Sequence, residues 1–258
     1  MKNKWFFLLF LSLYTLCTAL ILVWADASFL VITAVLFGAP IFVLWNRLTL
    51  QSHLVPLLAT FTLLATAIIQ IYAYKSGLWY ELSPLSLPVF GGAPLETYLF
   101  SVFHILYFIL LYEYFFDDGK SAKRTKISAR GLGVVGVGYA LVLGLIYTDP
   151  TILVAYPFAF LLAFMSSLFA VIILVQKSIP QLSLFKKAVL FALATLPLSL
   201  IYEWILIENG IRLFANVNEY VAYIEWNRQV FPVEELLLLL IIPFGLVLLY
   251  EMFIDDSR

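Results

Sequence analysis

Three acidic side chains stand at the start of two long apolar stretches of this chain. Glu96 follows Pro94 by two residues, and Glu234 and Glu235 follow Pro232. Proline is favoured at the first position of a helix, and acids in the first turn face the positive end of the helix dipole. An N-terminal cap would account for one acid per helix but not for two in succession. Because adjacent helical residues point about 100° apart, we expect one acid of the pair to cap the helix and the other to face the interior.

A fourth acid, Glu203, lies inside an apolar stretch rather than at its edge. An ionisable group at such a position is costly to bury and is a functional candidate by default. Glu203 precedes Gly210 by seven residues, as Gln70 precedes Gly77, so we expect the two positions to correspond. The four glutamates could carry out acid–base chemistry, in which one protonated carboxyl donates a proton and another carboxylate accepts one. No Ser/His/Asp pattern indicates a nucleophile, and no cluster has metal-ligand spacing.

The two stretches that begin with these acids match each other along their length. Residues 94–118 align with residues 232–256 at a shift of ~138 positions, and both end in a Tyr-Glu pair, Tyr112-Glu113 and Tyr250-Glu251. Such a match indicates a tandem duplication. The acids of the Tyr-Glu pairs lie about 25 Å from the helix starts at 1.5 Å per residue. We therefore expect them in a separate layer, with a structural or lipid-facing role at the headgroup boundary.

The composition places these helices in a membrane. Of the 258 residues, 64% are hydrophobic and 12% are charged, which is more apolar surface than a soluble domain of this size can bury. Eight apolar segments approach the ~20 residues that a membrane helix needs; they are 5–24, 28–45, 53–74, 94–116, 131–147, 151–175, 186–207 and 232–254. We expect an all-α polytopic membrane protein of about eight transmembrane helices in two parallel four-helix repeats. The repeats would cover 1–118 and 131–258, joined by a basic cytoplasmic linker at 119–130.

The basic residues set the orientation. With a cytoplasmic N-terminus, only Lys75, Arg212 and Arg228 of the 15 Lys and Arg residues fall in outside segments, which is a clear positive-inside pattern. Both termini are then cytoplasmic, and we expect a multi-pass protein of the cell (inner) membrane. The net charge of −1 gives no case for a nucleic-acid partner, and the single cysteine allows no disulfide. The outside loops 75–93 and 208–231 are expected to be solvated connections, with a lid over the acids as the alternative.

Two further features have ordinary interpretations. His104 lies two turns inside Glu96, and a lone membrane histidine is typically a hydrogen-bonded packing residue, with a proton relay as the alternative. Residues 131–136, GLGVVG, match a dinucleotide-binding pattern but lie in a membrane segment with no preceding strand. Small residues recur nearby every four positions, which favours close helix packing. No cofactor is expected.

The stretches GLW…GGAPLETYLF and FPVEELLLLL resemble the tandem membrane domains of the lycopene cyclases of actinobacteria, archaea and fungi. In that family each domain has a Pro-x-Glu-Glu helix start, with polar residues on the helix before it. The resemblance implies redox-neutral cyclisation of the acyclic end of a carotenoid. An acid protonates the terminal double bond, an internal alkene attacks the cation, and a ring proton is lost. The resemblance implies Glu234 or Glu235 as the acid, with Glu96 and Glu203 as base or polarising partners.

The first half departs from the second at three positions. Thr97 takes the place of the second acid of the motif, Gln70 that of Glu203, and Trp79 that of Arg212. The second half is thus better equipped for acid chemistry. The resemblance implies that the residues lining the substrate include Gln70, Trp79, Thr97 and His104.

Two alternatives stay open. The acids could serve a proton-coupled transporter or a lipid-binding membrane protein, although transporter charges usually lie near the bilayer midplane and these lie near helix starts. The chain could also be a non-catalytic cyclase subunit. Under the leading hypothesis its partners are a carotenoid dissolved in the bilayer and the membrane lipids. The sequence leaves open the ring type, whether one or both ends are cyclised, and the oligomeric state.

Overall fold

The computed structural model describes residues 2–48, 54–83, 92–117, 182–214, 220–226 and 229–251. Its elements in chain order are α1 (Lys2–Trp24), α2 (Phe29–Thr33), the π-helical turn η1 (Ala34–Gly38), α3 (Ala39–Trp45), α4 (Leu54–Ser76), β1 (Tyr80–Glu81), α5 (Leu95–Leu111), the π-helical turn η3 (Tyr112–Phe116), α8 (Leu182–Glu208), β2 (Arg212–Leu213), β3 (Tyr223–Trp226), β4 (Gln229–Pro232) and α9 (Val233–Leu249). The expected linker 119–130, the expected helices 131–147 and 151–175 and the GLGVVG stretch lie outside these residues.

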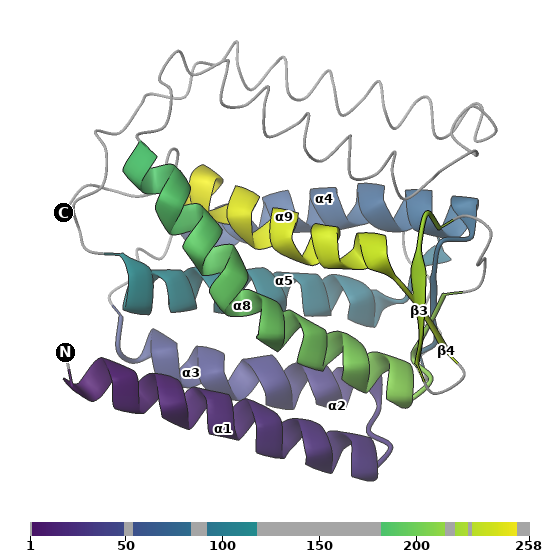
Figure 1. The fold of residues 1–258 in the computed structure, drawn as a ribbon, viewed down its shortest axis with the longest axis horizontal. Coiled ribbons are helices and arrows are strands. Elements are labelled where there is room, and N and C mark those ends of the chain that lie inside the picture. Colours follow the sequence, from purple (N-terminus) through teal and green to yellow (C-terminus); the bar gives the residue numbers. More distant parts are fainter. Residues whose placement is uncertain are drawn as a thin grey trace.

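The described part of the chain is mostly helical, and its helices lie side by side (Figure 1). Three are long and apolar enough to cross a membrane, namely Lys4–Trp24, Leu95–Phe116 and Leu184–Glu208, and Phe29–Trp45 is a shorter apolar helix. On α1, Phe6 is 74% exposed, as expected of a side chain that faces lipid. These features indicate a membrane protein.

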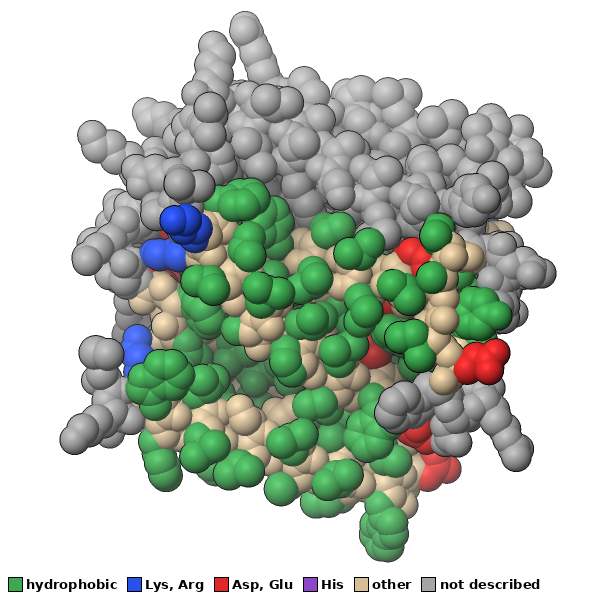
Figure 2. Space-filling model, in the orientation of Figure 1, with side chains coloured by type: hydrophobic (Ala, Val, Ile, Leu, Met, Phe, Trp, Pro, Cys, Tyr) green, Lys and Arg blue, Asp and Glu red, His purple; other side chains and the backbone are tan. Residues whose placement is uncertain are grey.

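The two ends of the bundle differ. The helix α1 begins and α9 ends at one end, while β3 and β4 lie at the other (Figure 1). Figure 2 shows a broad apolar surface between them, with Lys and Arg gathered at the first end and most of the visible Asp and Glu at the second. We call these the basic end and the strand end.

The helices α4 and α8 terminate in the same way. Each is followed by a glycine with positive φ, Gly77 at 71° and Gly210 at 63°, a conformation that costs glycine little. The amide after each glycine donates to a carbonyl five residues back, which closes a Schellman motif: Leu78 N to Ala73 O at 3.0 Å, and Ile211 N to Leu206 O at 2.8 Å. The chain therefore reverses at the strand end and runs back past the last turns of its own helix.

The segments after these turns pair with each other. Strands β1 and β2 are antiparallel, with Glu81 opposite Arg212, and β3 pairs with β4. Tyr220 donates its hydroxyl to the Leu78 carbonyl at 2.5 Å, and both Arg212 and Tyr220 are buried. The expectation of a solvated connection is therefore wrong for this part of 208–231. Nor is the described chain purely helical, because strands β1 and β2 join the segments 75–93 and 208–231.

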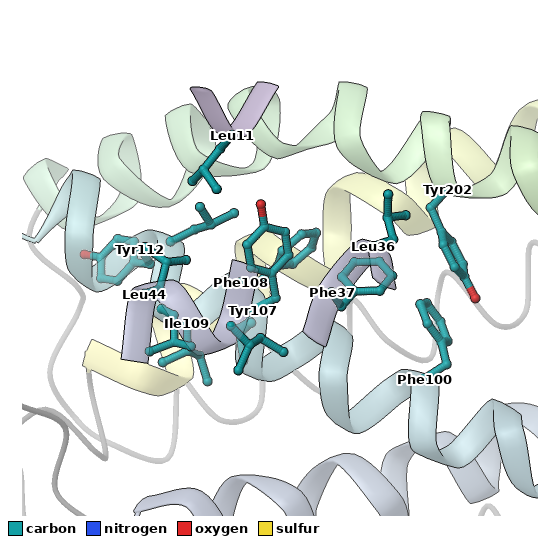
Figure 3. Close-up of a cluster of buried hydrophobic side chains, with 14 of the residues drawn as sticks. Leu11, Leu36, Phe37, Leu44, Phe100, Tyr107, Phe108, Ile109, Tyr112 and Tyr202 are labelled. Atoms are coloured by element: carbon teal, nitrogen blue, oxygen red, sulfur yellow. The ribbon is translucent and has the colours of Figure 1, made fainter. Parts of the chain in front are cut away.

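Aromatic side chains fill the core between α1, α5, α8 and the helix Phe29–Trp45 (Figure 3). The π turn η1 interrupts that helix, and a π turn leaves backbone groups in need of other partners. Tyr14 of α1 supplies one by donating its hydroxyl to the Val35 carbonyl at 2.6 Å. Phe37, also in η1, has no exposed surface and packs against Phe100, Tyr107 and Tyr202.

At the basic end, η3 and the residues just after α9 are joined by two reciprocal contacts. Tyr112 donates its hydroxyl to Glu251, and Tyr250 donates its hydroxyl to Glu113. The two tyrosine rings lie 6.1 Å apart, and Glu251 is buried. Of the structural and lipid-facing roles expected for these acids, the contacts favour the structural one.

Candidate active site

A buried arginine surrounded by carboxyl groups lies at the strand end. Arg212 donates from Nη1 to Glu203 Oε1 at 2.5 Å and from Nη2 to Glu81 Oε1, and its Nη1 lies 3.7 Å from Glu235 Oε1. The Arg212 side chain is 8% exposed, while the three glutamate side chains are 0% to 4% exposed. We call these four residues the acid cluster.

Backbone geometry brings the acid cluster together from both halves of the chain. The turn at Gly210 sends Arg212 back along α8, where Glu203 lies one to two turns before the helix end. The pairing of β1 with β2 places Glu81 opposite Arg212, although 131 residues separate them. Glu235 arrives from the first turn of α9, which packs against α8.

Thr97 belongs to the surroundings of the acid cluster. It is fully buried in the first turn of α5 and donates its hydroxyl to Glu81 Oε2. The residue that replaces an acid in the first half therefore holds a carboxyl group that comes from the same half.

The adjacent acids of α9 point in different directions, as neighbouring helical positions do. Glu235 faces Arg212, whereas Glu234 accepts from the backbone N–H of Val221. Glu96 likewise accepts from the Ser83 hydroxyl, so its hydrogen bond also goes to the preceding loop. The expectation that one of these carboxyls caps its own helix is thus wrong.

Glu203 and Gln70 make equivalent contacts. Trp79 Nε1 donates to Gln70 Oε1 at 3.2 Å, and Arg212 donates to Glu203; nine residues separate the partners in each pair. The polar pair of the first half is neutral and the pair of the second half is charged. Both follow from the same helix end, in which the residue two after the glycine turns back toward the residue seven before it.

The charges in the acid cluster do not balance when every group is ionised. Burial by itself opposes a charge on Arg212, but Glu203, Glu81 and Glu235 raise the pKa of its guanidinium well above the usual value, so it stays cationic. One guanidinium then faces three carboxyl groups. Uncompensated charge is expensive in a buried site, and a proton on one carboxyl removes part of it.

Several polar atoms of the acid cluster have no hydrogen-bond partner among the described residues. They are Oε2 of Glu203, Oε2 of Glu235 and Nε of Arg212. A buried polar atom without a partner is rare in folded proteins and calls for an explanation. Within the described ranges, no group of three or more His, Cys, Asp or Glu residues is arranged to hold a metal ion.

His104 lies seven residues beyond Thr97 on α5, a rise of roughly 10 Å toward the basic end. Its Nε2 is buried and makes no hydrogen bond among the described residues, so the expectation of a hydrogen-bonded packing residue is not met at this atom. Four aromatic rings surround the imidazole, those of Phe37, Phe100, Phe108 and Tyr202.

Two members of the acid cluster were not predicted as site residues. The sequence places Arg212 in a segment expected outside and makes it the counterpart of Trp79, but it marks neither Arg212 nor Glu81 as a site residue. Arg212 carried a signal, because it stands where the other half has Trp79. Glu81 carried none of comparable strength, because its part in the site depends on a strand of two residues that pairs across the two halves.

Comparisons with family models, with curated proteins and with solved structures found no significant match to this chain. The chemistry of the site must therefore be judged from its own residues.

Proposed function

We propose that this protein is a carotenoid cyclase that closes a ring at the acyclic end of a polyene such as lycopene. The observation that carries the proposal is the acid cluster, in which three buried carboxyl groups share one guanidinium. A site of this kind can keep one carboxyl protonated next to ionised neighbours, as acid–base catalysis requires. The resemblance of the two helix starts to the membrane lycopene cyclases supports the same chemistry.

Distances to Arg212 favour Glu235 as the proton donor. Glu203 and Glu81 both accept hydrogen bonds from the guanidinium, so their negative charge is stabilised. The nearest oxygen of Glu235 is 3.7 Å away, beyond hydrogen-bond distance, and its other oxygen has no partner among the described residues. Of the three carboxyl groups, Glu235 therefore interacts least strongly with the guanidinium, and it is the one that stays protonated.

The reaction uses this proton without any oxidant or cofactor. Glu235 protonates the terminal double bond, and the resulting cation is attacked by an internal alkene, which forms the carbon–carbon bond of the ring. Loss of a ring proton to a base leaves a new ring double bond. One proton enters and one leaves, so the product is an isomer of the substrate.

Paired contacts support two parallel repeats within a bundle of about eight transmembrane helices. Ser83 bonds to Glu96 and Val221 bonds to Glu234, 13 residues apart in each case. The Gln70–Trp79 and Glu203–Arg212 pairs, and the reciprocal Tyr–Glu contacts, repeat the same correspondence. In this arrangement the basic end and both termini face the cytoplasm, and the acid cluster lies near the outer surface of the cell membrane.

The position of the acid cluster favours a cyclase over a proton-coupled transporter. Transporter sites usually lie near the bilayer midplane, where helices are broken. Here the charged groups gather at helix ends and strands, where one end of a polyene that spans the bilayer could reach them. Thr97 also weakens the case for an inactive subunit, because it binds Glu81 and completes the site.

Expression in lycopene-accumulating bacterial cells tests the proposal. We expect mono- or bicyclic carotenoids from the wild type and a loss of at least ~100-fold for Glu235→Gln, the usual scale for a general acid. Glu234→Gln should lose far less, because an amide oxygen can still accept from Val221 N–H. Glu225→Gln, at an exposed position of β3, is the control.

Unchanged lycopene in cells with verified membrane expression of the wild type would refute the proposal. Proton-coupled uptake of a solute into liposomes by that same preparation would then favour a transporter.

A further inference from the structure

The cyclisation needs a second group, which removes a proton from the ring after the carbon–carbon bond has formed. That group must be a base, and it must face the ring from another side than the acid. The unpartnered buried atoms of the described residues outside the acid cluster are Thr33 Oγ1, Glu96 Oε2, His104 Nε2, Tyr202 Oη and Glu234 Oε2. Among these residues, His104 places a basic ring nitrogen within a group of aromatic side chains.

Aromatic faces surround the His104 imidazole. Its ring lies 5.0 Å from Phe100 in a stacked arrangement, 5.3 Å from Phe37 and 6.2 Å from Tyr202. Phe100 and Tyr202 are themselves stacked at 4.2 Å with an interplanar angle of 4° (Figure 3). Aromatic faces attract a cation within about 6 Å, and the attraction is strongest where water is excluded.

The aromatic group adjoins the acid cluster. Tyr202 precedes Glu203 on α8 and interacts electrostatically with Arg212, Glu81 and Glu203. His104 also interacts electrostatically with Arg212. Along α5, His104 lies roughly 10 Å from Thr97, which holds Glu81. That separation is comparable with the size of one six-membered ring, so a donor in the cluster and an acceptor at the imidazole could act on different atoms of the same ring.

The backbone of η1 brings a third aromatic side chain against His104 and Tyr202. The π turn η1 presents Phe37 to both His104 and Tyr202, and π turns inside helices often occur at functional sites. His104 as a whole is half-buried, while its Nε2 is buried among the surrounding aromatic rings.

Resting on the cyclase function proposed above, we propose that His104 is the base that deprotonates the ring, with Phe37, Phe100 and Tyr202 stabilising the cyclic cation. A C–H bond next to the cationic carbon breaks, and its electron pair becomes the ring double bond. His104 Nε2 takes the proton. The imidazolium then returns a proton to the Glu235 carboxylate, and both groups regain their starting states. A neutral, weakly basic imidazole suffices here, because a C–H bond beside a carbocation is strongly acidic.

Substitution of His104 with chemical rescue tests this role in membranes that contain the full-length chain. We expect His104→Ala to cut the rate of cyclisation by at least ~100-fold and added imidazole to restore part of it in a concentration-dependent way. Glu235→Gln, which lacks the acid instead, should not respond to imidazole. His104→Gln keeps a polar side chain of similar length without a base, and we expect it to lower the rate and to alter the ratio of β, ε and γ rings.

The outcomes separate the two proposals. An inactive wild type removes both of them. With an active wild type, a normal rate and ring ratio in His104→Ala or His104→Gln overturns the role of His104 alone. The role of His104 is also overturned if His104→Ala, present in the membrane at wild-type levels, loses cyclisation activity that imidazole does not restore. A purely structural packing role predicts that result. Where the alanine variant fails to accumulate, the rate and ring ratio of His104→Gln decide.

Discussion

Replacement of Arg212 by methionine removes the positive charge from the acid cluster while keeping much of the side-chain volume. Because Arg212 and its three carboxyl partners are all buried, the relevant comparison is the removal of one partner from a buried ion pair, which costs about 3–5 kcal/mol. At about 2–4 °C per kcal/mol for a chain near this size, the thermal midpoint in detergent should fall by on the order of 10 °C.

Two further variants identify the cause of that loss. Arg212→Met/Glu203→Gln removes one of the stranded carboxylates, so it should be more stable than Arg212→Met alone, a coupling that independent sites do not show. Arg47→Met is the control, because Arg47 is exposed. Its guanidinium lies 4.2 Å from the Phe7 ring and donates to the Tyr114 hydroxyl at 3.4 Å, and exposed contacts of this kind are worth about 1 kcal/mol each. Equal midpoints for Arg212→Met and Arg47→Met, or a double variant no more stable than Arg212→Met, would refute our view of the cluster as a buried, mutually dependent set of charges.

Other contacts give predictions that unfolding in detergent can check. Tyr112→Phe should lower the free energy of unfolding by about 1.5–3 kcal/mol, because the Tyr112 hydroxyl donates to the buried Glu251. Tyr250→Phe should cost less, because the Tyr250 hydroxyl donates to the half-buried Glu113. Equal losses would mean that burial of the acid does not set the difference. Gly210→Ala should cost about 1 kcal/mol through its positive φ of 63°. Gly38→Ala, with ordinary helical geometry and a nearest contact at 3.6 Å, should cost little, and the reverse order would contradict the Schellman turn.

The helices could be predicted from the sequence because their signals are local. Apolar runs near membrane length, with prolines and acids at one end, mark α5 and α9, and the observed bounds Leu95–Leu111 and Val233–Leu249 fall within the expected segments. The matched distances to Gly77 and Gly210 also predicted the correspondence of Gln70 with Glu203, which make equivalent contacts. The π turn at Ala34–Gly38 has no such local signal, although it presents Phe37 to Tyr202 in the core.

The composition of the acid cluster could be predicted only in part. Glu203 and Glu235 were chosen because an acid inside or beside an apolar run demands an explanation. Their shared partner could not be predicted, because a charged residue in a loop is normally solvated and Arg212 is buried only because the chain reverses at Gly210. Glu96 and Glu234 have the same sequence signal as Glu235 but make their contacts with preceding loops, and no sequence rule separates these cases.

The separation of Glu81 and Arg212 along the chain also sets the order in which the residues of the acid cluster are synthesised. The ribosome completes Glu81 131 residues before Arg212, a delay on the order of 10 s at typical rates of synthesis. From the synthesis of Thr97 until that of Glu203, the chain contains Glu81 and Thr97 but not yet Glu203, Arg212 or Glu235. A nascent or truncated chain that stops in its first half therefore lacks three of the four residues of the acid cluster, which can assemble only after Glu235 at the start of α9 has been made.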